Sequence, residues 1–368
     1  MNSPPTLTDA AIAPNVAAPQ HGPRPLPLFL DILMRQTEND PVLRTRALAG
    51  LKRYQNATRP TRPPAPVVHA TAQTAKLLHF QSGSGDNNTP IVLIPSLINP
   101  PDVLDLSEKT SLMRWLAARG HNAFLVDWGH PAADAQNLGL ADHVAQQLLP
   151  LLQSLDNGQP PILVGYCLGG TLAAGAAACM SLSALVTIAA PWNFSGFPEA
   201  SRRDIVRLWA GAKPLCQRLG YVPMEVLQSG FWSLDPARTI AKYAEFGEME
   251  EGSEAEAAFI TLEDWANAGP PLTYAAGQEL FEKLYEQDAT ASGFWAIGDT
   301  IVRPQDFDVP TLAICSSTDR IVPAGSAPPL AEKWLLDMGH VGMIVGRRAP
   351  QSLWVPLSEW LFKHERRC

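Results

Sequence analysis

The stretch "VGYCLGGTL", Val164 to Leu172, sets a cysteine between two glycines and follows it at once with a third. The apolar residues before it, "PILV", are typical of a buried strand, and "TLAAGAAACM" after it is typical of a helix. A strand, then Gly-x-Cys-x-Gly, then a helix is the pattern of a nucleophile elbow, with cysteine where serine is more common. The pattern predicts that Cys167 stands in a strained turn at a helix N-terminus, where the helix dipole favours a thiolate. The alternative is a buried structural cysteine, which the five-residue frame disfavours.

The elbow lies in a long uncharged run, because no Asp, Glu, Lys or Arg occurs from Asn157 to Pro198. A transmembrane helix would need about 20 continuous apolar residues. Prolines and glycines interrupt this run, and its character changes from β-rich to helix-rich and back to β-rich. We therefore expect a strand–helix–strand unit covered on both faces and no transmembrane segment.

The same alternation continues on both sides of the elbow and predicts a doubly wound, mostly parallel α/β sheet with the α/β-hydrolase fold. We expect the core to comprise 67–191 and 306–368. Residues 192–305, where the alternation lapses, are expected to form an inserted helical cap. Residues 1–66 are expected to be a disordered segment, over 1–25, followed by short helices. The basic residues of those helices and the acidic stretch "EFGEMEEGSEAEA" of the cap are interpreted as solvated surface.

Composition excludes several classes of function. The chain has 368 residues and a formal net charge of −8, which does not favour a nucleic-acid partner. Its five cysteines show no Cys-x-x-Cys spacing, so neither a disulfide framework nor a zinc cluster is expected, and no other metal or cofactor is indicated. The start, "MNSPPTLTDAAIAPN", lacks a basic region followed by an apolar stretch, so we expect no signal peptide and a cytoplasmic protein.

A cysteine nucleophile needs a base and a group that orients the base. In α/β-hydrolases the chain order is nucleophile, acid, histidine. Asp319 follows the predicted strand "TLAICSS", and His340 stands in a glycine-flanked loop further on. Asp337 is the reserve candidate for the acid. The weaker candidates for the base are His69, His79, His121, His130, His143 and His364.

The oxyanion hole is expected to use backbone N–H groups rather than side chains. One donor would be Leu168, directly after the nucleophile, and the second would come from the loop after "IVLIP", at Ser96 or Leu97. A cysteine that attacks an acyl thioester exchanges one thioester for another, and the acyl group stays activated toward an alcohol. The thiol therefore favours acyl transfer from a donor such as an acyl-CoA over plain ester hydrolysis.

At these residues the sequence resembles the polyhydroxyalkanoate (poly-β-hydroxybutyrate) synthase family. "GYCLGGT" is similar to the lipase-like box of that family, and the other similar segments are "LIPSLINPPDVLDL", "FLVDWGHP", "TIAAPWNFS", "STDRIVP" and "GHVGM". The short chain and the cap segments "LEDWANAGPP" and "LYEQD" look most like the catalytic subunit of the two-component (class III) synthases. Two departures from the pattern are the loop at Ser96 and Leu97 and the "DMGHVGM" segment, which bear on acceptor geometry and chain-length preference.

The resemblance implies a role for each matched residue. Cys167 would carry the acyl group, His340 would activate the thiol, and Asp319 would orient His340 or help to activate the 3-hydroxyl of the incoming acyl unit. The implied reaction polymerises (R)-3-hydroxyacyl-CoA into a polyester and releases CoA. A second synthase subunit, a homodimer and a position at the surface of polymer granules are expectations of the same kind.

Two other functions fit the same residues. A cysteine hydrolase, either a thioesterase or an intracellular polyester depolymerase, would have the same elbow and triad. The exclusion of water by the cap would decide between hydrolysis and polymerisation. A non-catalytic protein at the granule surface would keep the fold but has no need of Cys167, Asp319 and His340 together.

Overall fold

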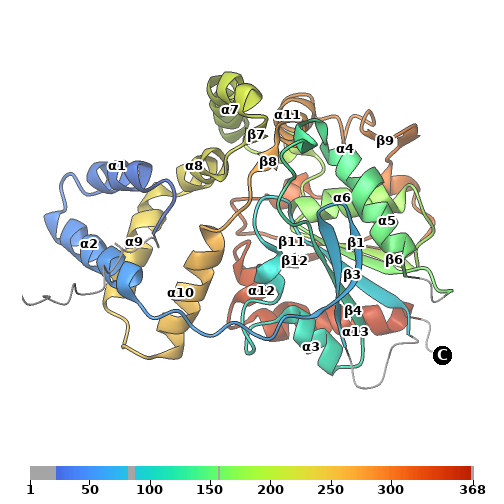
Figure 1. Ribbon diagram of the computed structural model, residues 1–368, viewed down its shortest axis with the longest axis horizontal. Coiled ribbons are helices and arrows are strands. Elements are labelled where there is room, and N and C mark those ends of the chain that lie inside the picture. The colour runs from blue at the N-terminus through green and yellow to red at the C-terminus, as the bar shows by residue number, and fades with distance from the viewer. Residues whose placement is uncertain (1–21, 82–87, 156–157, 366–368) are drawn as a thin grey trace, which may run out of the picture.

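The structure is a computed structural model that describes residues 22–81, 88–155 and 158–365. In these residues eight strands form one sheet in the order β1-β2-β4-β3-β5-β6-β11-β12 (Figure 1). The strands are β1 (Val67–Ala72), β2 (Ala75–Phe80), β3 (Pro90–Ile94), β4 (Asn122–Asp127), β5 (Ile162–Tyr166), β6 (Ala184–Ile188), β11 (Thr311–Ser316) and β12 (Glu332–Leu336). From β4 to β12 all neighbours are parallel, whereas β2 pairs antiparallel with both β1 and β4. The predicted α/β-hydrolase fold is confirmed.

Both faces of the central strands are covered, which explains their continuous apolar runs. Every residue of β3, β5 and β6 is buried. Val92 and Ile94 face the core cluster beneath α4 (Leu140–His143), α5 (Leu149–Gln153) and α6 (Leu168–Ala177). Ile91 and Leu93 face the opposite cluster, beneath α3 (Leu112–Ala118) and α13 (Val355–His364) (Figure 1). The remaining core segments are η1 (Pro101–Leu104), η2 (Ala135–Asn137), η3 (Val144–Leu148), η6 (Pro304–Asp306), η7 (Ala324–Ser326), α12 (Gly342–Val345) and η8 (Pro350–Trp354).

The uncharged run around the elbow forms β5, α6 and β6 inside this core. No helix in the described parts of the chain combines the length and apolar character that a membrane span requires.

The segment between β6 and β11, most of which we propose as the cap, carries most of the remaining helices. Its elements are η4 (Phe194–Gly196), α7 (Glu199–Leu219), β7 (Tyr221–Val222), α8 (Met224–Leu234), α9 (Pro236–Gly247), α10 (Glu254–Ala266), β8 (Leu272–Thr273), α11 (Tyr274–Gln278), η5 (Glu279–Glu286), β9 (Ala296–Ile297) and β10 (Thr300–Ile301). Trp265 of α10 donates its indole N–H to the carbonyl of Pro100 at 2.9 Å, which ties this segment to the core.

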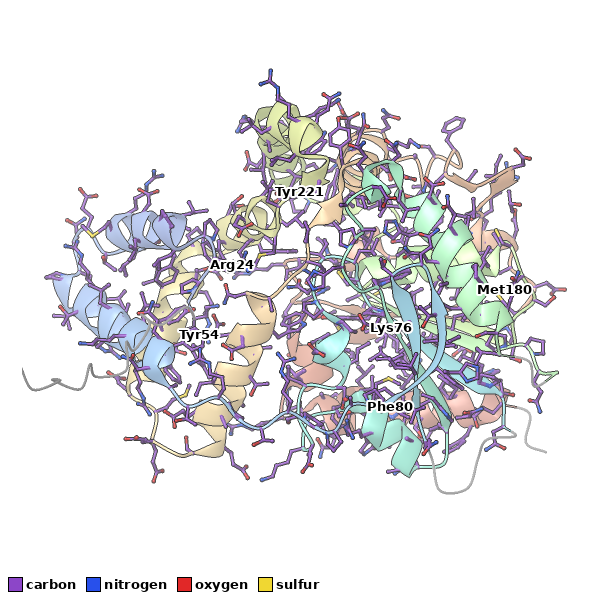
Figure 2. The ribbon with its side chains drawn as sticks, in the orientation of Figure 1. Arg24, Tyr54, Lys76, Phe80, Met180 and Tyr221 are labelled. Carbon is purple, nitrogen blue, oxygen red and sulfur yellow. The ribbon has the colours of Figure 1, made fainter. Side chains whose placement is uncertain are left out.

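The two N-terminal helices, α1 (Leu26–Gln36) and α2 (Pro41–Asn56), pack on α9 and α10 and not on the sheet (Figure 1). A Cβ added to Gly50 would lie 1.8 Å from the carbonyl oxygen of Tyr243, so α2 and α9 meet at close backbone contact. Tyr54, which lies far from the sheet residue Lys76 in Figure 2, donates its hydroxyl to Asp264 of α10 at 2.5 Å. The expectation of disorder at residues 1–25 falls mostly outside the described residues.

Most charged side chains of the basic helices and of the acidic stretch are exposed, as expected, but several of the basic ones form ion pairs with the proposed cap. Arg53 forms an ion pair with Glu256 at 2.6 Å, and Arg46 pairs with Glu248 at 2.7 Å. Arg59 pairs with Asp264 at 3.0 Å. The basic helices and the acidic stretch lie about two hundred residues apart in the chain, so local patterns could not show these pairings.

Candidate active site

Cys167 lies between the last residue of β5 and the first residue of α6, with φ 55° and ψ −134°. A non-glycine residue at positive φ is strained, and such strain persists only where the surrounding structure holds it. Two backbone hydrogen bonds hold it here. The Cys167 N–H donates to the carbonyl of Ile188 at 2.9 Å, and the Cys167 carbonyl accepts from Gly170 N–H at 2.9 Å.

The elbow glycines are required by close backbone contacts. A Cβ on Gly165 would lie 2.3 Å from the Cα of Gly170, and one on Gly169 would lie 2.0 Å from the carbonyl oxygen of Ile94. Both distances are far below van der Waals contact. The absence of side chains at Gly165 and Gly169 therefore allows the elbow to pack closely on the end of β3 and on the start of α6.

Asp319 and His340 come from the loops that follow β11 and β12, at the same end of the sheet as Cys167. The imidazole Nδ1 lies 2.6 Å from Asp319 Oδ2, and the side chain of Asp319 is fully buried. Asp319 Oδ1 accepts from the N–H groups of Ile321 and Val322 at 2.8 and 3.0 Å. Both carboxylate oxygens are thus in use inside the protein.

The pKa of His340 is the result of opposing effects. Burial alone would lower it, because burial disfavours the charged ring. The negative charge of Cys167, hydrogen bonds with Asp319 and Cys167, and the charge of Asp319 outweigh burial and raise the pKa of His340 from 6.5 to about 10. The charges of Cys167 and Asp319 therefore favour the protonated form of the His340 ring. We name Cys167, His340 and Asp319 the elbow cluster.

The two residues predicted for the oxyanion hole lie in segments that meet. Leu168 begins α6, and Leu97 lies in the loop after β3. A Cβ added to Gly169 would also lie 2.5 Å from the carbonyl oxygen of Pro95. The loop after β3 therefore lies directly against the elbow. Trp128 donates its indole N–H to the same Pro95 carbonyl at 2.9 Å and fixes the loop from the other side.

A cavity of about 520 Å³ adjoins that loop, and we name it the loop cavity. Its lining includes Leu97, Trp128 and residues 270–273. Most of its polar lining is neutral, and Asp134 is the carboxylate in it. Such a lining suits a neutral chain with carbonyl or amide groups better than a phosphate.

The other candidates lie away from the elbow cluster. Asp337 is exposed, and its backbone carbonyl accepts from Arg348 at 2.6 Å. His121 is buried between Ser358 and Glu365 beneath the C-terminal helix. His143 Nδ1 donates to the carbonyl of Gly139 at 2.7 Å, and burial lowers the pKa of His143. The remaining candidates, His69, His79, His130 and His364, are exposed or half-buried.

Two tyrosines near the nucleophile were not predicted. The hydroxyl of Tyr166 donates to the backbone carbonyl of His340 at 3.3 Å. Tyr285 of η5 has its pKa raised by burial and then by the charge of Cys167, which places its phenol within electrostatic reach of the thiol. Tyr166 directly precedes Cys167 and could have been considered. Nothing in the local sequence of Tyr285 indicates that it approaches the elbow. In the described residues no group of three or more His, Cys, Asp or Glu side chains is arranged to hold a metal ion.

Comparison with known proteins gives the family. The family model described as "Alpha/beta hydrolase family" matches residues 91–350. The poly(3-hydroxyalkanoate) polymerase subunit PhaC of Haloferax mediterranei is 26% identical over 353 residues, covering 91% of this chain and 72% of the relative. The subunit of the same name from Thiocystis violacea is 23% identical over 297 residues, covering 76% of this chain and 82% of the relative. A solved thermophilic esterase from Thermogutta terrifontis aligns with a TM-score of 0.49 and 15% identity over 82% of this chain and 99% of its own.

These relatives confirm the resemblance that the sequence motifs carry, and it extends over most of the chain. The chain belongs to the alpha/beta hydrolase family, and its curated relatives within that family are polyhydroxyalkanoate polymerases.

Proposed function

We propose that this chain is an acyltransferase that polymerises (R)-3-hydroxyacyl-CoA into polyhydroxyalkanoate and releases CoA through a thioester on Cys167. The observation that carries the proposal is the position of Cys167 at a strained elbow beside the buried His340–Asp319 pair. The polymerase relatives support the choice of substrate.

In the first step the Cys167 thiolate attacks the carbonyl carbon of the acyl-CoA. The bond from Cys167 Sγ to the acyl carbon forms, the bond from that carbon to the CoA sulfur breaks, and the His340 imidazolium gives its proton to the departing CoA thiolate. The raised pKa of His340 supports this role, because it keeps the ring protonated until the leaving group needs the proton. His340 is then neutral and ready to act as a base.

In the second step the 3-hydroxyl of another hydroxyacyl-CoA attacks the Cys167 thioester. The hydroxyl oxygen forms an ester bond to the acyl carbon, the bond from that carbon to Sγ breaks, and the hydroxyl proton moves to His340. The ion pair of thiolate and imidazolium is restored. The lengthened acyl-CoA then acylates Cys167 as in the first step, and the backbone N–H groups of Leu168 and Leu97 would bind the oxyanion of each tetrahedral intermediate.

Asp319 is proposed to orient His340 and not to touch the substrate. One of its oxygens binds His340 and the other accepts two backbone N–H groups, while its side chain has no exposed surface. A carboxylate so enclosed has no free oxygen to offer to an incoming hydroxyl. These contacts favour the first of the two roles that the family resemblance allows. A second subunit and a homodimer remain predictions.

The test is to supply (R)-3-hydroxybutyryl-CoA, measure CoA release and identify the acyl product in the same sample. A growing oligoester, absent with Cys167→Ala, is the expected result. Release of CoA with only free hydroxy acid would instead identify a thioesterase. If CoA release does not depend on Cys167, even with a second synthase subunit added, the proposal is wrong.

A further inference from the structure

A second cavity, of about 470 Å³, lies on the proposed cap between the first turns of α7 and the end of η5. Three arginines of α7 line it, Arg202, Arg203 and Arg207, together with Tyr285 and Glu286 of η5. We name it the arginine pocket. It groups three guanidiniums, of which Arg203 and Arg207 have carboxylate partners within α7 and Arg202 has none among the described residues.

The guanidinium of Arg202 has only neutral partners in the described residues. Its Nε and Nη2 donate to the backbone carbonyl of Tyr285 at 3.2 and 3.0 Å, and Nη2 also reaches the carbonyl of Glu286 at 3.5 Å. These contacts hold the side chain in place and leave its charge without a carboxylate within ion-pair distance. A fixed guanidinium of this kind is suited to a phosphate oxygen.

Arg203 and Arg207 bind only weakly to the rest of the protein. Arg203 pairs with Glu199, which also lines the pocket, and Arg207 pairs with Asp204 at 3.0 Å. Both pairs lie within α7 and are exposed, so each contributes little to stability. An anion that entered the pocket could therefore recruit both guanidinium groups. Three guanidiniums face two carboxylates, Glu199 and Glu286, among the lining residues.

Tyr285 connects the pocket with the elbow cluster. Its ring is held by Phe194 and Phe197, with ring centroids 4.8 and 5.3 Å away. Its backbone carbonyl is bound by Arg202, and its phenol lies within the electrostatic reach of Cys167 described above. Tyr285 therefore borders the pocket, and its ring packs on residues that follow β6, the strand whose Ile188 carbonyl accepts from the Cys167 N–H.

We propose that the arginine pocket binds the phosphate groups of the CoA moiety while the thioester end of the same molecule reaches Cys167. This inference rests on the proposed function, because that function supplies an acyl-CoA as substrate. The loop cavity is the less suitable place for phosphates, since Asp134 lines it and no Lys or Arg does. The arginine pocket would thus bind the phosphate groups of CoA. The loop cavity would bind uncharged parts of the substrate.

The test is to titrate CoA and, separately, pantetheine, which lacks phosphate, into the full chain by calorimetry. Arg203→Glu and Arg207→Glu remove pocket charge without touching the contacts that hold η5. Arg218→Glu is the matched control, because it makes the same charge change on an exposed residue of α7 that does not line the pocket. We expect each pocket variant to raise the Kd of CoA at least tenfold, Arg218→Glu to change it less than twofold, and no variant to change pantetheine binding.

The inference is overturned if the wild type does not bind CoA, or if Arg218→Glu weakens CoA binding as much as the pocket variants do. The binding measurement also separates this inference from the proposed function. Arginine-dependent CoA binding without Cys167-dependent release of CoA would keep the pocket and reject the polymerase. Polymer formation with unchanged CoA binding in both pocket variants would keep the proposed polymerase function and reject the role of the arginine pocket.

Discussion

Two clusters in this molecule combine a histidine, a carboxylate and a side chain that could act as a nucleophile. The elbow cluster is Cys167, His340 and Asp319. The other, which we name the C-terminal cluster, is Ser358, His121 and Glu365: His121 Nε2 lies 2.7 Å from Ser358 Oγ, and its Nδ1 contacts Glu365 Oε1. By composition and contacts, the C-terminal cluster looks like a serine hydrolase triad.

The two clusters differ in access and in backbone. Ser358 lies inside the regular helix α13, and the side chains of His121 and Glu365 have no exposed surface. Cys167 stands at positive φ on a partly exposed elbow, and the side chain of His340 is 7% exposed. Contacts alone therefore do not identify a reactive triad, and the features that distinguish the elbow cluster are the positive φ of Cys167 and the partial exposure of Cys167 and His340.

The largest contrast is expected between the two nucleophiles. Cys167→Ala should lower CoA release from (R)-3-hydroxybutyryl-CoA by at least about 10³-fold, because no other group can carry the acyl chain. Ser358→Ala should keep release within twofold. Circular dichroism of both variants checks that each is folded. Equal losses in the two variants would remove the distinction between the clusters.

The acids give the next contrast. Asp319→Asn should lower kcat by about 10²- to 10⁴-fold, since an amide at this position favours the wrong tautomer of His340. Asp337→Asn, a neighbour of His340 in sequence with an exposed side chain, should stay within twofold. Steady-state rates at saturating substrate measure both. A large loss in Asp337→Asn would show that the acid has been misassigned.

The C-terminal cluster should matter for stability. His121→Ala leaves Glu365 buried without its partner and removes a ring stacked 4.0 Å from Phe362, so we expect a loss of about 3–5 kcal/mol in the free energy of unfolding. Urea denaturation measures the loss. The rate per folded molecule should not change at a temperature where the variant is folded. A reduced rate with unchanged stability would contradict the structural role.

The last contrast concerns the pH dependence of stability. The pKa of His340 rises from 6.5 to about 10 in the folded protein, so its contribution to stability is fully present below pH 6.5 and is lost as pH rises toward 10. The free energy of unfolding in urea should therefore fall more between these pH values in the wild type than in His340→Gln. Cys167→Ala should show a smaller fall than the wild type, because the charge of Cys167 is the largest of the effects that raise this pKa.

The elbow and the sheet could be predicted from the sequence because their signals are local. Gly165 and Gly169 are required by contacts with residues a few positions away or with the neighbouring strand, and the buried strands read as continuous apolar runs. Asp319 and His340 could be placed in loops because each follows a segment that the sequence predicts as a strand, β11 and β12. The catalytic roles of these residues remain to be tested by the variants above.

The remaining features depend on contacts between distant segments. Tyr285 of η5 packs on Phe194, which follows β6, and the charge of Cys167 acts on its phenol. No periodic pattern in the sequence predicts this contact between distant segments. The pairing of Arg53 with Glu256 likewise joins segments that each look like ordinary charged surface. The C-terminal cluster was missed for the same reason, since His121 and Glu365 are 244 residues apart.

The close contact of Gly50 with Tyr243 sets a limit on how far α9 can travel from the sheet. Because α2 is fastened to α9 there, any movement of α9 takes α2 with it. The only covalent link from α2 back to the sheet is the run 57–66, and Arg59 is itself held by Asp264 of α10. Further along the run, Arg62 pairs with Asp102 at 3.9 Å, and the carbonyl of Pro64 accepts from Arg114 at 2.6 Å, so the run is bound to the core as well. Any separation of α9 and α10 from the core would therefore have to break the contacts of this run as well as the hydrogen bond from Trp265 to Pro100.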